Sequence, residues 1–174
     1  MNLSTAIHLI TKGFDPSAKP QTWVDLGCGT GLFTQALAAV VSTGSKLYAV
    51  DKEPASLEKV DIKSNDIALT KVHQDFVHDL PAWGSCDGIL MANSLHFVSD
   101  KLTFMRRIKG TLKPKGKIIV VEYEMEHPNA WVPYPIPLLA LNELMSNVGF
   151  SSVTKLVEEP SVFNPAKLYS ALIA

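Results

Sequence analysis

The chain has few of the features that mark secreted, metal-binding or membrane-spanning proteins. Only two cysteines occur, Cys28 and Cys86, and neither lies in a cluster of zinc-like ligands, so we expect reduced thiols and no metal site. The first residues lack the basic stretch and apolar run of a signal peptide. No apolar run is long enough to span a bilayer. We therefore expect a cytoplasmic protein without membrane contact.

The chain also lacks an excess of positive charge. Its net charge is −1, which gives no strong overall field toward nucleic acid, so a nucleic-acid partner is not expected. One basic stretch, between Lys101 and Lys117, is interleaved with apolar residues such as Met105 and Ile108. It is best explained as the solvated side of an amphipathic helix and the turn after it, with RNA binding as the less favoured alternative. The basic residues are Lys101, Arg106, Arg107, Lys109, Lys113, Lys115 and Lys117.

What is present points to one globular domain over residues 1–174. The length suits a single domain, and apolar residues make up 47% of the chain, enough for a sizeable core. Internal repeats, low-complexity tracts and interdomain linkers are absent. The sequence leaves the oligomeric state open.

Short β-like runs alternate with helical patterns along the chain. Strands are predicted at residues 22–26, 46–51, 68–73, 86–91, 117–122, 152–157 and 167–173. Helices are predicted at residues 2–12, from 32 to a stop near Gly44, from Pro54, after Ser99 or Asp100 as far as Leu112, and at 138–148 with Gly149 as the stop. A turn is predicted at residues 113–116, and the stretch 124–137 is rich in proline and aromatic residues.

Repeated strand–helix alternation predicts a doubly wound α/β fold. The run 117–122 is apolar on both faces, as a strand in the middle of a parallel sheet is when helices cover both sides. In such sheets, ligands bind outside the carboxyl ends of the strands, where the strand order reverses.

The strongest motif follows the first predicted strand, in Val24-Asp25-Leu26-Gly27-Cys28-Gly29-Thr30-Gly31. Glycines at such a position allow a tight turn and a close approach of the backbone to a ligand. The third glycine comes two residues after the second, which differs from the dinucleotide-binding spacing. A carboxylate, Asp25, also precedes the loop. An ordinary strand–helix turn is the alternative explanation.

Two more carboxylates fall at the ends of the next strands. Asp51 closes the second strand, where a carboxylate can accept both hydroxyl protons of a ribose. It could instead cap the helix that begins at Pro54. Asp75 follows the third strand in His73-Gln74-Asp75-Phe76, and its alternative is a loop aspartate beside a core phenylalanine.

Taken together, the glycine loop, Asp51 and Asp75 resemble the successive motifs of the class I S-adenosylmethionine-dependent methyltransferases, and the resemblance covers residues 23–174. It implies a seven-stranded, mostly parallel sheet with helices on both faces and an antiparallel last strand. It also implies that S-adenosylmethionine is the cofactor, that S-adenosylhomocysteine is the product, and that Asp75 and Phe76 hold the adenine. The implied cofactor-binding residues are Asp25, Gly27, Cys28, Gly29, Gly31, Asp51, Lys52, Asp75, Phe76 and Asn93. The helix at 2–12 would cover the cofactor.

The fourth strand is followed by Met91-Ala92-Asn93-Ser94-Leu95-His96, which resembles the family's fourth motif. Members that methylate amines of nucleic-acid bases usually carry Asn/Asp-Pro-Pro-aromatic here, and this chain does not. Methylation of base amines is therefore disfavoured, whereas other nucleic-acid methylations stay open. We expect a small-molecule acceptor.

His96 is the candidate general base, since an imidazole can take a proton near neutral pH. It could equally pack or cap within the loop. Candidate acceptor-binding residues are Glu122, Tyr123, Trp131 and Tyr134, of which the last two could form an aromatic wall or a hydrophobic plug. Two other functions stay open: a nicotinamide-dependent oxidoreductase, and a non-catalytic module that binds S-adenosylmethionine.

Overall fold

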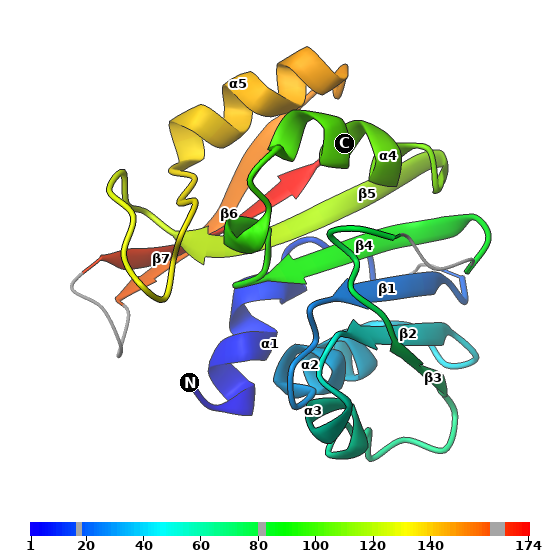
Figure 1. Ribbon diagram of the computed structural model, residues 1–174. Coiled ribbons are helices and arrows are strands. Elements are labelled where there is room, and N and C mark those ends of the chain that lie inside the picture. The colour runs from blue at the N-terminus through cyan, green and yellow to red at the C-terminus, as the bar shows by residue number, and fades with distance from the viewer. Residues whose placement is uncertain (17–18, 80–82, 161–165) are drawn as a thin grey trace.

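A computed structural model describes residues 1–16, 19–79, 83–160 and 166–174. Its centre is a seven-stranded sheet in the order β3-β2-β1-β4-β5-β7-β6 (Figure 1). The strands are β1 (Thr22–Leu26), β2 (Lys46–Asp51), β3 (Ala68–His73), β4 (Cys86–Ala92), β5 (Leu112–Tyr123), β6 (Val153–Pro160) and β7 (Lys167–Ile173). Strands β1 to β5 pair in parallel, whereas β7 pairs antiparallel with both β5 and β6. The predicted doubly wound sheet with an antiparallel last strand is confirmed.

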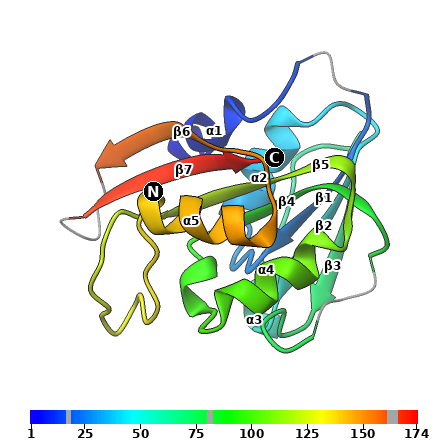
Figure 2. The ribbon, with the colours of Figure 1, turned by 90° about the horizontal axis from the view of Figure 1, so that it is seen from above.

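Helices cover both faces of the sheet (Figures 1 and 2). One face carries α1 (Leu3–Thr11), α2 (Leu32–Val40) and the short α3 (Pro54–Glu58), and the other carries α4 (Lys101–Lys109) and α5 (Leu138–Val148). A single 3-10 turn, η1 (Leu95–Phe97), follows β4. Asn2 and Asp100 cap α1 and α4 with side-chain oxygens, and Gly149 ends α5 in the left-handed conformation, as its sequence predicts.

The core lies on both sides of the central strands. Residues Ile118 to Val121 of β5 are completely buried, and alternate ones face opposite layers. In the adjacent pair β1 and β4, Trp23 lies opposite Gly88, and a Cβ on Gly88 would come within 2.5 Å of the Trp23 ring. A side chain at position 88 is therefore excluded, because a protein interior has no spare room for it.

Helix α1 forms where the sequence predicts it and packs into the core. Its buried residues Ala6, Leu9 and Ile10 pack in one cluster with Trp23 and residues of α2. None of the helix's residues lines the cavity described below, and the expectation that residues 2–12 cover the cofactor stays a prediction.

The region between α4 and β5 differs from the prediction. Leu112 was expected on the buried side of α4, but α4 ends at Lys109 and Leu112 begins β5 opposite Cys86. The expected turn at 113–116 lies inside β5, where the pairing jumps from Leu112 to Lys117 and Lys115 has φ +66°. The chain does bend there, but the strand resumes on the far side of the bend.

Candidate functional site

The strand order reverses between β1 and β4, and the loops after these two strands meet there. The glycine loop turns sharply because Gly27, Gly29 and Gly31 all have positive φ. A Cβ on Gly27 would lie 2.6 Å from Cβ of Ser94, which follows β4. The Ser94 hydroxyl donates a 2.6 Å hydrogen bond to the carbonyl of Leu26, the last residue of β1. The two loops therefore touch, and only glycine fits at position 27.

Asp51 ties the end of β2 to the glycine loop. Its Oδ2 accepts a hydrogen bond from the Gly29 amide at 2.7 Å, and its Oδ1 accepts one from the Glu53 amide at 2.9 Å. The second of these bonds leads into α3, where Pro54 occupies the first turn. Because a carboxylate can accept about four hydrogen bonds, Asp51 keeps acceptor capacity for a ligand.

Asp75 organises the turn after β3. Its Oδ1 accepts from the Val77 amide at 3.0 Å, and its Oδ2 lies 2.9 Å from Nδ1 of His78. Burial alone would raise the pKa of Asp75, but the hydrogen bonds from His78 and Val77 outweigh it and hold the pKa below its ordinary value. Phe76 is buried beside this carboxylate and packs against Phe104 of α4, with ring centroids 5.9 Å apart.

Asn93 follows β4 in the left-handed conformation, with φ +53°. Its amide donates to the Val121 carbonyl of β5 at 2.8 Å, which holds the backbone at the strand end. Its side-chain oxygen is buried and has no hydrogen-bond partner among the described residues. A non-glycine residue in this conformation is uncommon, and such residues gather at functional sites.

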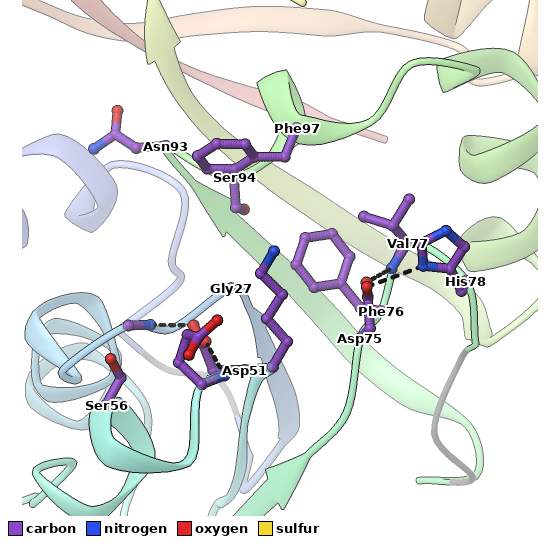
Figure 3. A pocket seen from close by; sticks show the side chains of 13 residues that line it. Gly27, Asp51, Ser56, Asp75, Phe76, Val77, His78, Asn93, Ser94 and Phe97 are labelled. Atoms are coloured by element: carbon purple, nitrogen blue, oxygen red, sulfur yellow. Dashed lines mark hydrogen bonds and ion pairs between the residues drawn. The ribbon is translucent and has the colours of Figure 1, made fainter. Parts of the chain in front are cut away.

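These strand ends enclose one cavity of about 540 Å³. Figure 3 shows Asp51, Asp75 and Asn93 approaching it from different segments. Seven of the residues predicted to bind a cofactor line it: Gly27, Gly29, Asp51, Lys52, Asp75, Phe76 and Asn93. Six further lining residues were not predicted: Glu53, Ser56, Val77, His78, Ser94 and Phe97. Four of the six lie within two residues of a predicted cofactor-binding residue, so a wider window around each motif would have found these four.

Three predicted residues lie outside the cavity lining. Gly31 packs under Val60, where a Cβ would come within 2.9 Å, and Cys28 is buried, which raises the pKa of its thiol. Asp25 is 1% exposed and accepts a 2.7 Å hydrogen bond from the Thr34 hydroxyl through Oδ2. Burial, together with the charge of Asp51, raises the pKa of Asp25 to about 7 despite the Thr34 hydroxyl. The other oxygen, Oδ1, has no partner within the described part of the chain.

The structure pairs His96 with Glu122 in the interior. Oε2 of Glu122 lies 2.7 Å from Nδ1 of His96, and Oε1 accepts from the His96 amide at 3.1 Å. Both residues are almost fully buried, and His96 is only 3% exposed. The imidazole also packs in a tilted arrangement against the ring of Phe97, with ring centroids 4.4 Å apart, and Phe97 does line the cavity. His96 is thus one residue away from the cavity wall, with its orientation set by Glu122.

The proline-rich stretch 124–137 is anchored beside η1. The Tyr134 amide donates to the His96 carbonyl at 3.0 Å, and Lys101 donates to the carbonyls of Val98 and Tyr134. Two aromatic side chains of the stretch stay exposed, Trp131 at 84% and Tyr134 at 46%. Neither they nor Glu122 and Tyr123 are among the residues that line the cavity.

A family model described as a methyltransferase domain matches residues 24–120, more than half of the chain. The chain belongs to this family. The match begins in β1 and ends within β5, so it contains every residue that lines the cavity.

Individual relatives resemble this methyltransferase domain over only part of its length. It is 34% identical over 127 residues to a cypemycin N-terminal methyltransferase of a Streptomyces species, covering 64% of this chain and 50% of the relative. The chain therefore spans about half the length of that curated relative.

Two solved structures show the same fold at low identity. An Aquifex aeolicus methyltransferase described as SAM-dependent superposes with a TM-score of 0.69 at 17% identity, covering all of both chains. Human N-acetylserotonin methyltransferase, solved in complex with SAM, gives 0.67 at 21% identity and covers 98% of this chain and 51% of that one.

Proposed function

We propose that this methyltransferase domain binds S-adenosylmethionine in the cavity at the strand ends and transfers its methyl group to a small-molecule acceptor. One observation carries the proposal: the glycine loop, Asp51 and Asp75, from three consecutive strands, line one cavity. A cavity of about 540 Å³ falls in the range of small-molecule sites, roughly 300–1,000 Å³. Family membership supports the same assignment.

The residues present fit a purine nucleoside. Asp51 would accept the ribose hydroxyls, while Asp75 would accept from the exocyclic amine of adenine and Phe76 would pack on the ring. Lys52 and the glycines would line the sugar side. The backbone at Gly27 and Gly29 carries no Cβ, so the ligand can approach the loop closely.

The methionine end of the cofactor would satisfy acceptors that lack a donor. Oδ1 of Asn93, at the cavity wall, and Oδ1 of Asp25, outside the cavity lining at the start of the glycine motif, are buried and have no partner in the described residues. A buried acceptor without a donor is unfavourable, so such atoms are expected to meet a donor group of a ligand. An ammonium group offers three donors and a positive charge to a carboxylate.

When bound, S-adenosylmethionine supplies a methyl group on a positively charged sulfur, already activated toward a nucleophile. The protein then has to hold the acceptor in line and exclude water, and such positioning can supply roughly 7–11 kcal/mol. Phe97, 52% exposed and on the cavity wall, would form an apolar boundary on the acceptor side. Trp131 and Tyr134 would extend this boundary, with Tyr123 and Glu122 behind it.

His96 stays our candidate for the general base where the acceptor must lose a proton. Support comes from its pairing with Glu122: a carboxylate at Nδ1 fixes the tautomer and leaves Nε2 as the basic atom. Because the ring is 3% exposed, proton transfer through Nε2 needs the Phe97 side chain to move aside or a water to enter.

A small molecule is preferred to nucleic acid as the acceptor because the basic stretch is engaged within the protein. Lys101, Lys109 and Lys117 donate to main-chain carbonyls, and Lys113 pairs with Asp87 at 2.7 Å. We place the protein in the cytoplasm, a proposal that its two free cysteines support. No helix in the described part of the chain is long and apolar enough to cross a membrane.

Calorimetry with S-adenosylmethionine, S-adenosylhomocysteine and NADH tests the cofactor assignment. We expect both sulfur compounds to bind at one site and NADH not to bind. Binding of NADH alone would instead favour the oxidoreductase. Transfer of a labelled methyl group to compounds from a metabolite pool would then separate an enzyme from a module that only binds the cofactor.

A further inference from the structure

Arg107 on α4 lies against the turn that forms one wall of the cavity. Its guanidinium donates hydrogen bonds to three successive carbonyls, those of Phe76, Val77 and His78, at 3.3, 2.9 and 3.0 Å. All three residues line the cavity. The sequence pattern had placed Arg107 on the solvated side of an amphipathic helix.

The three carbonyls have no other hydrogen-bond partner among the described backbone groups. They follow the end of β3, so the sheet no longer pairs them. An arginine suits this place, because its planar group carries about five donors in a fixed fork, whereas a lysine ammonium acts as a point charge.

A second contact joins the same helix to the same turn. The Arg107 guanidinium lies 5.7 Å from the ring centroid of Phe104, and that ring packs against Phe76. The Arg107 hydrogen bonds and the contact between Phe104 and Phe76 therefore both connect α4 to the turn after β3. Asp75 holds it from the other, through the Val77 amide.

We propose that Arg107 is a positioning residue that holds the turn at residues 75–78 in the conformation that receives adenine. The structural part of this proposal concerns the protein without ligand. Its consequence for binding rests on the proposed function, since it takes S-adenosylmethionine to be the cofactor.

Arg107→Met tests the proposal, because it keeps much of the apolar stem and removes all three donors. Arg106→Met is the matched control: Arg106 is the preceding residue on α4, is exposed, and makes no hydrogen bond to the cavity wall. Arg107→Lys is the conservative variant, and it also serves if the methionine variant does not fold. Both Arg107 variants are first compared with wild type for cooperative unfolding.

Amide hydrogen exchange without ligand provides the first measurement. The amides of Val77, His78 and Asp79 all donate within the Asp75 turn. We expect their exchange to become about ten-fold faster in Arg107→Met, with a smaller increase in Arg107→Lys and none in Arg106→Met. Unchanged exchange in both Arg107 variants would overturn the proposal whatever the cofactor is.

Affinity for S-adenosylhomocysteine provides the second measurement. We expect about a ten-fold loss of affinity in Arg107→Met, a smaller loss in Arg107→Lys and less than a two-fold change in Arg106→Met. Faster exchange with unchanged affinity would refute the positioning role. If wild type does not bind S-adenosylhomocysteine, the proposed function fails, and the exchange measurement still decides whether Arg107 holds the turn.

Discussion

One carboxylate oxygen of Asp51 lies 2.7 Å from the backbone nitrogen of Gly29. This hydrogen bond joins the end of β2 to the loop after β1. The Ser94 hydroxyl, from beyond β4, donates to the carbonyl of Leu26 just before that loop. The loop is thus shaped by side chains of its neighbours before a ligand arrives. Such preorganisation reduces the entropy that binding has to offset.

Replacing Asp51 by alanine should weaken the binding of S-adenosylhomocysteine by about 1–3 kcal/mol, because a charged hydrogen-bond acceptor is lost. Asp51→Asn should lose less, since its carbonyl oxygen can still accept from an amide. Calorimetric titration measures both. Asp61→Ala, at an exposed carboxylate outside the cavity, is the control. Wild-type affinity in Asp51→Ala would remove this residue from the site.

Two glycines of the same loop should respond to alanine in different ways. Gly27→Ala places a Cβ 2.6 Å from Ser94, so we expect loss of cooperative folding or a large fall in stability. At Gly29 a Cβ would meet no atom within 4 Å. The backbone there has φ +52°, a left-handed conformation that would cost an alanine about 1–2 kcal/mol of stability. Gly29→Ala should therefore fold.

Because Gly29 lines the cavity, its added methyl group should also reduce cofactor affinity. Urea unfolding and titration with S-adenosylhomocysteine separate the two effects. The prediction fails if Gly27→Ala is as stable as Gly29→Ala.

Asp25 should make the stability of the free protein depend on pH. Its pKa is raised from 3.8 to about 7, so the folded state keeps a proton that the unfolded chain releases. The stabilisation that Asp25 contributes is therefore present at low pH and is lost as the pH rises from 3.8 to about 7.

Asp25→Asn removes this dependence. Above pH 7 the variant should be more stable than wild type by roughly 1–3 kcal/mol, and near pH 4 the two should be alike. Urea unfolding at pH 4.5 and pH 8 without ligand is the measurement, with Asp61→Asn as the surface control. Equal stability of Asp25→Asn and wild type at pH 8 would contradict a raised pKa.

For the base, the useful variant is His96→Asn. His96→Ala would leave the buried Glu122 carboxylate without its partner, at a cost of about 3–5 kcal/mol. The asparagine amide can still donate to Glu122 but cannot accept a proton. If His96 is the base, turnover should fall by about 10²- to 10⁴-fold while affinity for S-adenosylhomocysteine stays the same. His8→Asn, on the surface of α1, is the control, and full turnover in His96→Asn would exclude the role.

Much of the fold could be predicted because its signals are local. Alternating and continuous apolar runs located all seven strands, and β3 and β7 begin and end at the predicted residues. The boundary between α4 and β5 could not be predicted in this way. Leu112 continues the helical apolar spacing, but the Gly110 amide caps the helix, and pairing with Cys86 then takes Leu112 into the sheet.

The residues of the site also fall into two groups, those whose place the sequence predicts and those whose place it does not. Gly27 follows β1, Asp51 ends β2 and Asp75 lies two residues after β3. Parallel strands bring these ends together, so sequence position was enough. The partner of His96 was not predictable, because Glu122 lies 26 residues away and meets it only through the pairing of β4 with β5. The same holds for Arg107, whose three carbonyl partners lie about 30 residues earlier in the chain.

Strand β7 lies between β5 and β6, although it follows both in the chain. While the ribosome makes the protein, β1 to β5 emerge in an order that lets each find a neighbour. Strand β6 emerges before β7, with which it pairs, and the place of β7 beside β5 is then still empty. The outer backbone groups of β5 stay unpaired in that interval and could recruit a strand from another nascent chain. A chain that stops before Lys167 should therefore aggregate more during synthesis than the full-length chain.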